Sequence, residues 1–255
     1  LFFKPYGFFM RDLLQKIEFF FVQNEESKKL LASININNTI IIGDTRVDRV
    51  LDILSQNNKQ KLLEEFIQDQ DCFVAGSSWP EDLNLISKVI ESSEKLKTII
   101  APHNVDEKSL QEIESHFSKP IIRWSELSKK TDAESTILLI DCVGILTKVY
   151  SYANVAYVGG GMGNKGLHNT LEPAVFGIPV MIGKNYKNYQ EAMDLVALGG
   201  IISVDSSFNF YKEFSRVMKD KKLQKQMGIT NLKYIKSKAG TTFKIMNKLK
   251  QVLNS

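Results

Sequence analysis

One stretch of the sequence, residues 153–183, constrains the fold more than any other. It reads ANVAYVGGGMGNKGLHNTLEPAVFGIPVMIG, in which an apolar segment, Val155–Val158, runs directly into three consecutive glycines. A helical pattern follows from Asn169, and Gly177–Met181 has the character of a second strand. This order of strand, glycine loop, helix and strand predicts a βαβ unit. The glycines of such a loop let a ligand phosphate approach backbone N–H groups at the start of the helix. We therefore expect a nucleotide at this loop.

Two side chains near the start of the predicted helix have competing interpretations. Asn169 is a good N-cap, and Glu172 then falls at the third helical position, as in a capping box. Glu172 could instead accept hydrogen bonds from ribose hydroxyls, but it cannot do both. His103 follows a predicted strand and His168 precedes the helix, so each could face a ligand or could cap or pack. His116, on a helix flanked by lysines, is expected at the surface.

Composition narrows the class of protein. The 255 residues are 43% hydrophobic and 24% charged, as in an ordinary globular protein, and the net charge is +4. This mild excess suits an anionic ligand or an anionic membrane surface, and it is too small to indicate nucleic-acid binding. Cys72 and Cys142 lie in apolar, strand-like contexts, which predicts free buried thiols and a cytoplasmic setting.

The first residues do not resemble a targeting segment. Leu1–Met10 is rich in aromatic residues but lacks a basic region and a small-residue cleavage site, and no stretch of the sequence is long and apolar enough to span a bilayer. The chain is expected to be the middle of a larger protein. The aromatic residues are expected to pack against residues absent from this chain; contact with a membrane interface beside Lys4 and Arg11 is the alternative.

Strand and helix patterns alternate almost throughout the chain, which predicts a parallel sheet covered on both faces. No clear pattern covers residues 46–58, and we place a domain boundary there, with residues 1–48 in one domain and residues 49–255 in the other. A long lysine-rich helical stretch, Phe208–Leu253, is expected at the end. The predicted strands are Phe19–Gln23, Thr39–Ile42, Cys72–Ala75, Thr98–Ala101, Pro120–Trp124, Thr136–Ile140, Val155–Val158, Gly177–Met181 and Ile201–Val204.

Four loops follow predicted strands and are rich in glycine or polar residues. They are Gly76–Ser78, Pro102–Asn104, Asp141–Gly144 and Gly159–Gly161. Because ligands of parallel sheets bind beyond the carboxyl ends of the strands, we expect all four loops along one rim. Four such loops on one rim indicate a ligand site more strongly than a glycine triplet alone, since glycines also serve turns and close packing.

Other catalytic chemistries have no support in the sequence. The two cysteines and three histidines lack zinc-ligand spacing, and neither a nucleophile elbow nor a Walker lysine is present. Ser77 and Ser78 are therefore better explained as phosphate hydrogen-bond donors than as nucleophiles. Arg46 could pair with Asp44 or Asp48 at the surface, or it could clamp phosphate oxygens in a cleft between domains.

These elements, in this order, resemble the 3-deoxy-D-manno-octulosonic acid (Kdo) transferases of lipopolysaccharide assembly. The resemblance runs from about Phe20 to about Val204. It rests on these segments: Phe21–Ser27, Gly43–Val50, Gly76–Glu81, Ala101–His103, Tyr157–Gly161, Gly166–Ala174 and Asn188–Ala192.

The resemblance implies a GT-B glycosyltransferase without a metal or other cofactor, in which two Rossmann-like halves face each other. This chain would comprise the end of the N-terminal, acceptor-side domain and the complete C-terminal, donor-side domain. The family transfers Kdo from CMP-Kdo to a lipid A precursor at the cytoplasmic face of the bacterial inner membrane, so peripheral membrane contact is implied for the full-length protein. In the family, the residue matching Arg46 stabilises the transition state, and CMP contacts come from positions matching Pro102–His103, Val143–Ile145 and Asn169–Glu172.

The expected donor-binding set combines these implied contacts with the residues singled out above. It consists of Ser77, Ser78, Pro102, His103, Val143, Gly144, Ile145, Gly159, Gly160, Gly161, His168, Asn169, Thr170, Leu171, Glu172 and Gln190.

The chain departs from the family in two places. Ile145 stands where some relatives carry a Glu, so a contact there could come only from the backbone. The general base of the family is a Glu in a glycine-rich stretch of the acceptor-side domain, and no segment of this chain matches it. We therefore expect the chain alone to bind CMP without transferring sugar.

Two alternatives stay open at this point. Another GT-B protein, such as a UDP-sugar transferase or epimerase, would have similar glycine loops, because the motif glycines do not distinguish cytidine from uridine. A non-catalytic nucleotide-binding module is the second alternative for this stretch of sequence.

Overall fold

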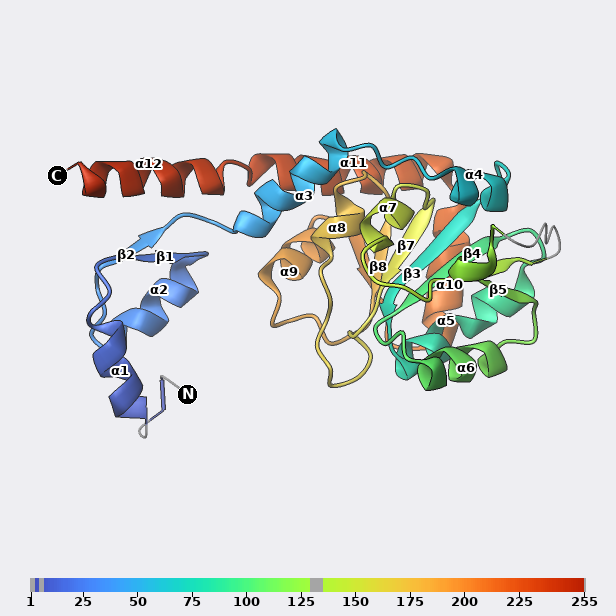
Figure 1. Cartoon of the computed structure of the whole chain (residues 1–255), viewed down its shortest axis with the longest axis horizontal. Coiled ribbons are helices and arrows are strands. Elements are labelled where there is room, and N and C mark those ends of the chain that lie inside the picture. Colours follow the sequence, from blue (N-terminus) through green and yellow to red (C-terminus); the bar gives the residue numbers. More distant parts are fainter. Residues whose placement is uncertain (1–2, 5–6, 129–134, 255) are drawn as a thin grey trace. The chain divides into compact units, whose positions relative to one another are not determined.

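The computed structural model describes residues 3–4, 7–128 and 135–254, with the side chain of Phe9 left out. The chain divides into two compact units (Figure 1). The first consists of Leu1–Asp52 together with Lys236–Ser255, and the second is the continuous stretch Ile53–Ile235. The first unit therefore contains both ends of the chain, and the second unit is inserted between them in the sequence.

A seven-stranded parallel sheet forms the centre of the second unit, in the order β5-β6-β4-β3-β7-β8-β9. The strands are short apolar runs, as expected for a sheet that is covered on both faces. The seven strands predicted between residues 72 and 204 are confirmed. Their bounds are β3 Cys72–Ser78, β4 Lys97–Pro102, β5 Ile121–Arg123, β6 Ile137–Leu139, β7 Val155–Val158, β8 Val180–Ile182 and β9 Ile201–Ser203.

Helices cover the two faces of this sheet with separate hydrophobic cores (Figure 1). Successive side chains of a strand point to opposite faces, so Phe73 belongs to one core and Val74 to the other. On the first face Phe73 packs against Phe210 and Phe214, with ring centroids 6.0 and 5.1 Å away. The first face is covered by α5 Pro80–Ser92, α6 Glu107–His116 and α10 Ser207–Lys219, and the second by α4 Lys61–Ile67 and α7 Leu146–Tyr150.

The remaining elements of the second unit are short helices and one long helix. They are the 3-10 turn η2 Trp124–Glu126, α8 Leu171–Ala174, α9 Gln190–Ala197 and α11 Lys221–Ser237. The helical stretch predicted over Phe208–Leu253 is confirmed, and the chain divides it into three helices. Asp220 is extended and its carboxylate accepts a hydrogen bond from the backbone of Leu223, which starts a new helix. Gly240 has a φ of +91°, which interrupts the helical backbone a second time, before the last helix.

The first unit contains a two-stranded parallel sheet, in which Phe20 of β1 pairs with Thr39 of β2. Both strands were predicted. Most of the stretch 46–58, for which the sequence shows no clear pattern, forms a regular helix, α3. The elements are α1 Phe8–Leu14, β1 Phe20–Val22, α2 Glu25–Ala32, β2 Thr39–Ile41, α3 Thr45–Ser55, whose last turn passes into the second unit, and α12 Thr241–Leu253.

A carboxylate on α3 ties the end of the chain to the first unit. The side chain of Asp48 accepts hydrogen bonds from the backbone N–H groups of Gly240 and Thr242, each at 2.6 Å. Partial burial acts to raise the pKa of Asp48, but these hydrogen bonds outweigh it and hold the pKa below its ordinary value. The sequence predicts residues 49–255 as one domain. The structure instead groups Lys236–Ser255 with the first unit.

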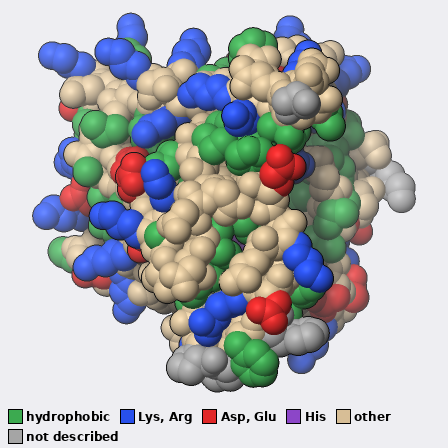
Figure 2. Space-filling view, turned by 90° about the vertical axis from the view of Figure 1, so that its left-hand side faces the viewer, with side chains coloured by type: hydrophobic (Ala, Val, Ile, Leu, Met, Phe, Trp, Pro, Cys, Tyr) green, Lys and Arg blue, Asp and Glu red, His purple; other side chains and the backbone are tan. Residues whose placement is uncertain are grey.

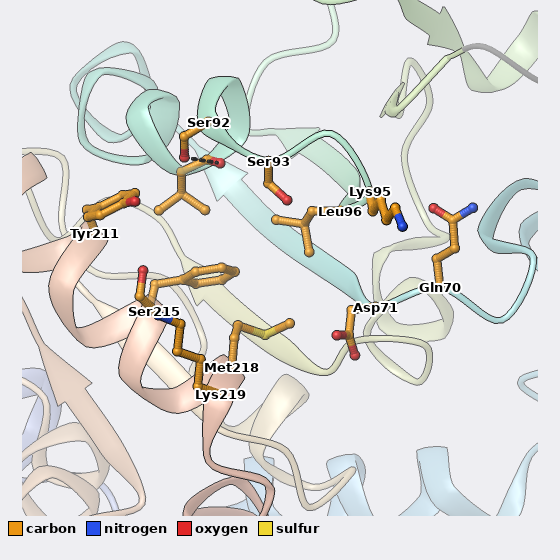
Figure 3. A pocket seen from close by; sticks show the side chains of 12 residues that line it. Gln70, Asp71, Ser92, Ser93, Lys95, Leu96, Tyr211, Ser215, Met218 and Lys219 are labelled. Atoms are coloured by element: carbon orange, nitrogen blue, oxygen red, sulfur yellow. Dashed lines mark hydrogen bonds between the residues drawn. The ribbon is translucent and has the colours of Figure 1, made fainter.

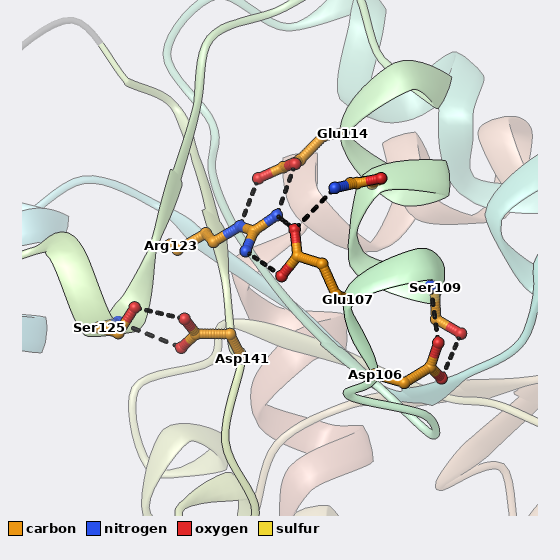
Figure 4. A network of polar contacts seen from close by, with 8 residues as sticks. Asp106, Glu107, Ser109, Glu114, Arg123, Ser125 and Asp141 are labelled. Atoms are coloured by element: carbon orange, nitrogen blue, oxygen red, sulfur yellow. Dashed lines mark hydrogen bonds and ion pairs between the residues drawn. The ribbon is translucent and has the colours of Figure 1, made fainter.

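A network of charged side chains joins the edge strand β5 to α6 (Figure 4). The guanidinium of Arg123 donates to Glu107 at 2.8 Å and to Glu114 at 2.7 Å, and both carboxylates raise the pKa of Arg123. Beside it, the backbone N–H and hydroxyl of Ser125 donate to the two carboxylate oxygens of Asp141. Asp141 follows β6, so this contact fixes the start of the predicted loop 141–144.

The surface drawn in Figure 2 carries Lys and Arg side chains dispersed among polar and hydrophobic ones. This distribution accords with a small net charge of +4. Among the residues that the structure describes, no helix has the length and apolar character needed to cross a membrane.

A hollow of about 530 Å³ lies between the end of α5, the start of β4 and α10 (Figure 3). Leu96 and Met218 line it together with Ser92, Ser93 and Lys95. The hollow is at the amino ends of the strands. Parallel sheets bind their ligands at the opposite edge, so it is not the expected position for a nucleotide.

Gly228 provides a test of the packing of α11. A Cβ at this position would lie 1.9 Å from the carbonyl oxygen of Gly177. We expect Gly228→Ala to lower the free energy of unfolding by about 1–3 kcal/mol through overpacking. Helix propensity alone would raise it by about 1 kcal/mol. Urea denaturation measures whether the free energy of unfolding falls or rises. The exposed neighbour Ile229→Ala is the control, with an expected change within about 0.5 kcal/mol; a stabilised Gly228→Ala variant would contradict the close approach.

Candidate functional site

Loops that follow four neighbouring strands form the candidate site. The strands β6, β4, β3 and β7 are adjacent and parallel, so their carboxyl ends meet at one edge of the sheet. Backbone hydrogen bonds join three of the loops: Gly159 donates to Gly76 at 2.9 Å, His103 to Ser78 at 3.0 Å, and His168 to Gly159 at 3.1 Å. The expectation of a single rim is confirmed.

The glycines of this rim are required by close backbone contacts. A Cβ at Gly159 would lie 2.2 Å from the carbonyl oxygen of Ser77, and one at Gly160 would lie 2.0 Å from the carbonyl oxygen of Gly166. Gly160 also has a φ of +88°, a conformation that favours glycine. Close packing of the loops thus explains these glycines without any ligand, which is the simpler of the two roles considered for them.

A buried carboxylate that the sequence analysis did not identify organises the glycine loop. Asp82, in the first turn of α5, is fully buried. Its side chain accepts hydrogen bonds from the hydroxyl of Tyr157, the N–H of Gly160 at 2.8 Å and the N–H of Trp79 at 2.9 Å. Burial raises the pKa of Asp82, while the hydrogen bonds from Tyr157, Gly160 and Trp79 act in the opposite direction. Asp82 therefore joins the loop after β7 to the start of α5.

Three rings gather beside this carboxylate. Trp79 stacks on His103 with 4.3 Å between ring centroids and 21° between planes, and His103 lies 4.8 Å from His168. The indole N–H of Trp79 donates to Nε2 of His168 at 3.2 Å. Burial and the neighbouring His103 lower the pKa of His168, against a smaller opposing effect of Asp82. The lowered pKa favours the neutral form of His168. Trp79 was not predicted as a site residue.

The helix after His168 begins one residue later than predicted and has a single turn. Thr170 is the N-cap of α8, so the capping box predicted for Asn169 and Glu172 is wrong. The carboxamide oxygen of Asn169 accepts from the N–H of Leu171 at 3.2 Å, which turns the chain before the helix starts. The amide nitrogen of Asn169 donates to Glu172 at 3.1 Å, so these two side chains are paired beside the rim.

Several of the predicted donor-binding residues have side chains that are buried or already hydrogen-bonded within the protein. Thr170 and Leu171 are buried, which leaves their backbone as the accessible part. Gln190 begins α9, and its amide donates to Asp194 on the same helix at 2.7 Å. The hydroxyl of Ser78 is buried without a hydrogen-bond partner in the structure.

The loop before α7 is exposed at the rim. Val143 is 80% exposed, and Gly144 has a φ of +95° with open space where a Cβ would lie. Ile145 is the N-cap of α7, without a side-chain capping hydrogen bond. This loop leaves its backbone accessible, as the departure from the family at Ile145 requires.

Arg46 belongs to the first unit, where it pairs with Asp44. Its guanidinium donates to the carboxylate of Asp44 at 2.6 and 2.9 Å. The surface pairing considered for Arg46 is thus present with Asp44, whereas Asp48 bonds to the start of α12. The role of Arg46 in a transition state stays a prediction.

A cavity of about 400 Å³ opens beside Trp79, between α5 and α6. Ser78, Pro102, Asn104 and Lys165 contribute to its wall, and the ammonium of Lys165 lies 5.2 Å from the Trp79 ring centroid. Within residues 3–4, 7–128 and 135–254, no three His, Cys, Asp or Glu side chains cluster as a metal site would require.

Substitution of Asp82 tests its organising role. We expect Asp82→Ala to lower the free energy of unfolding by about 3 kcal/mol or more, because two N–H groups and a hydroxyl lose their acceptor. Asp82→Asn is expected to cost only about 1 kcal/mol, since one amide oxygen can still accept both N–H groups. Denaturant unfolding of both variants measures the difference. Equal losses would show that the acceptor role does not matter.

The pH dependence of the same pair gives an independent check. Burial raises the pKa of Asp82 above its ordinary 3.8, so the folded protein holds this proton more firmly than the unfolded chain does. The stability of the wild type relative to Asp82→Asn is therefore expected to be greatest below pH 3.8 and to fall as the pH rises toward the folded pKa. Melting temperatures of both proteins between pH 3.5 and 7 measure this difference. If the melting temperature of the wild type rises relative to that of Asp82→Asn as the pH rises, the raised pKa is refuted.

Comparison with known proteins supports the resemblance seen in the sequence. No family model matches the chain. The 3-deoxy-D-manno-octulosonic acid transferase of Chlamydophila psittaci is 27% identical over 206 residues, which cover 78% of this chain and 47% of that protein. A bifunctional glycosyltransferase/methyltransferase of Fusobacterium nucleatum is 30% identical over 193 residues, or 73% of this chain and 30% of that protein. The chain spans less than half the length of these curated relatives.

A solved structure shows the same fold. The C-terminal CMP-Kdo binding domain of WaaA from Acinetobacter baumannii matches with a TM-score of 0.59 and 19% identity, over 74% of this chain and 97% of that one. The structural neighbours have the GT-B architecture that the sequence predicts. The chain thus has the Rossmann-like fold found in GT-B proteins, and it resembles the C-terminal part of the 3-deoxy-D-manno-octulosonic acid transferases.

Proposed function

We propose that this chain is the donor-binding part of a transferase that moves Kdo from CMP-Kdo to a lipid A precursor. The observation that carries the proposal is the rim itself. There, the Asp82-anchored glycine loop lies beside His103 and His168, within the segments that resemble Kdo transferases. Such a rim, at the carboxyl ends of parallel strands, is where this architecture binds nucleotides.

The open loop before α7 is suited to the base of the nucleotide. Val143 and Gly144 leave backbone groups accessible to a planar ring, and Ile145 contributes no polar side chain. The paired side chains of Asn169 and Glu172 are suited to the ribose hydroxyls and the phosphate, as the family implies for these positions. The buried hydroxyl of Ser78 has no hydrogen-bond partner in the described part of the chain, and we propose that it donates to a phosphate oxygen when the nucleotide binds.

The proposed reaction is a single inverting displacement at the anomeric carbon of Kdo. The acceptor hydroxyl attacks as CMP leaves, and positive charge develops on the sugar while negative charge gathers on the phosphate. Hydrogen-bond donors of the rim stabilise that negative charge. Arg46 is proposed to add its guanidinium to the phosphate, which requires part of its pairing with Asp44 to be exchanged for the ligand.

The acceptor and the location of the reaction form part of the same proposal. A lipid A precursor is a lipid, so the full-length enzyme works at a membrane surface, here the cytoplasmic face of the inner membrane. The family's general base has no counterpart in the residues of this chain. We therefore expect the chain to bind the donor without transferring Kdo. An assay with CMP-Kdo and a lipid A precursor tests this, and detectable transfer would refute it.

Calorimetric titration of the chain with CMP and with UMP tests the donor class. We expect CMP to bind at least about tenfold more tightly than UMP, a difference of about 1.4 kcal/mol. Equal affinities would favour a UDP-sugar transferase or epimerase, and absence of CMP binding would overturn the proposal.

Two glycine variants test where the nucleotide binds. Gly160→Ala is expected to abolish CMP binding, because its Cβ would collide with the carbonyl oxygen of Gly166 and displace the loop. Gly199→Ala is the matched control: its φ of +78° imposes similar backbone strain, but a Cβ there would enter open space. It is expected to bind CMP like the wild type. Circular dichroism of both variants confirms folding, and normal CMP binding by a folded Gly160→Ala variant would place the nucleotide elsewhere.

A further inference from the structure

The hydrogen bond between Trp79 and His168 determines which nitrogen of His168 carries the proton. An indole N–H can only donate, so Nε2 of His168, 3.2 Å away, has to accept and therefore carries no proton. A neutral imidazole with a bare Nε2 carries its proton on Nδ1. If both ring nitrogens carried protons, the N–H of Trp79 and the Nε2–H of His168 would face each other at this contact without an acceptor. The geometry thus selects one neutral form of His168.

The surroundings of His168 favour the same neutral form. The ring is about half buried, and His103 faces it from the end of β4 at 4.8 Å. Asp82 on α5 is the nearby acidic group, but its carboxylate is occupied by three other donors. The ammonium of Lys165 is a charged group that faces Trp79, 5.2 Å from its ring centroid. Burial and His103 lower the pKa of His168, whereas Asp82 raises it by a smaller amount.

The second nitrogen of His168 is available to a ligand. The described residues provide no hydrogen-bond partner for Nδ1. The Cδ2 edge of the ring lies against the glycine loop, 3.1 Å from where a Cβ of Gly160 would stand, and Nδ1 lies on the opposite edge. We propose that Trp79 is a positioning residue, whose indole N–H fixes His168 as a neutral donor so that Nδ1–H binds an oxygen of the nucleotide held at the rim. The identity of the ligand rests on the proposed function, whereas the protonation of His168 does not.

A neutral donor at this place has a chemical advantage over a charged one. A histidine with an ordinary pKa of 6.5 would gain and lose charge near neutral pH, and its attraction for a phosphate would vary accordingly. With its pKa lowered by burial and His103, His168 begins to gain a proton at a lower pH than an ordinary histidine does. The neutral hydrogen-bond donor is therefore favoured over a wider pH range.

A merely structural role for Trp79 is the competing explanation. Its ring stacks on His103, so it could serve packing alone. Trp79→Phe separates the two roles, because phenylalanine retains an aromatic ring for the stack but has no N–H. The other tryptophan, Trp124, begins the 3-10 turn after β5 and provides the matched control Trp124→Phe.

The decisive measurement is the protonation of the imidazole nitrogens by NMR. The chain has three histidines, so a sample labelled with ¹⁵N-histidine gives three ring systems, assigned with His103→Gln and His116→Gln. In the wild type without ligand, His168 is expected to show a proton on Nδ1 and none on Nε2. In Trp79→Phe we expect the Nε2–H form to become populated and the pKa of His168 to rise, with both unchanged in Trp124→Phe. A wild-type His168 protonated on Nε2 would overturn the proposal, whether or not any variant folds.

Nucleotide binding tests the second half of the inference. Trp79→Phe is expected to weaken CMP binding by about 3- to 10-fold at pH 7.5, the effect of one poorly oriented hydrogen bond. Trp124→Phe is expected to leave the affinity unchanged. Addition of CMP to the labelled wild type should shift the Nδ1 resonance of His168. If CMP binds without that shift, the inference is wrong while the proposed function stands. If CMP does not bind, the proposed function fails, and the ligand assigned to Nδ1–H fails with it.

Discussion

The arrangement of the rim depends on a carboxylate that is buried among neutral donors. Asp82 receives hydrogen bonds from β7, from the glycine loop and from the residue before α5, through Tyr157, Gly160 and Trp79. A buried acceptor with several donors is costly to remove, since each donor then lacks a partner. Asp82 therefore links the loop that follows β3 to the loop that follows β7. The rings of Trp79 and His168 take their positions from these linked loops.

This anchoring changes the meaning of the glycine triplet. Glycine loops after a strand are commonly explained by a phosphate that approaches the backbone. Here a Cβ at Gly159 would collide with the carbonyl oxygen of Ser77 in the loop after β3, and a Cβ at Gly160 with that of Gly166 further along its own loop. Their immediate function is to let these loop segments pack together, and the surface that results is what a ligand would meet. The chemistry of that surface comes from side chains such as His168 and Asn169.

Much of the fold was predictable because it depends on local patterns. Apolar runs between polar turns identified the strands of the large sheet, and the rule for parallel sheets placed their loops on one rim. Features that depend on distant partners were not predictable. Asp82 acts on Tyr157 and Gly160, and Trp79 acts on His168; each pair is separated by more than seventy residues and leaves no periodic signal. The early start predicted for α8 failed because Asn169 caps a turn rather than the helix itself.

The contact between Asp48 and the start of α12 has a consequence for how the chain is made. Residues 53–235 are continuous and contain every strand of the large sheet, so this unit can fold as soon as residue 235 has left the ribosome. The first unit cannot close then, because the N–H groups that satisfy Asp48 belong to Gly240 and Thr242. Residues 1–52 thus become structurally complete only after residues 236–255 have been made, later than the unit whose sequence follows them.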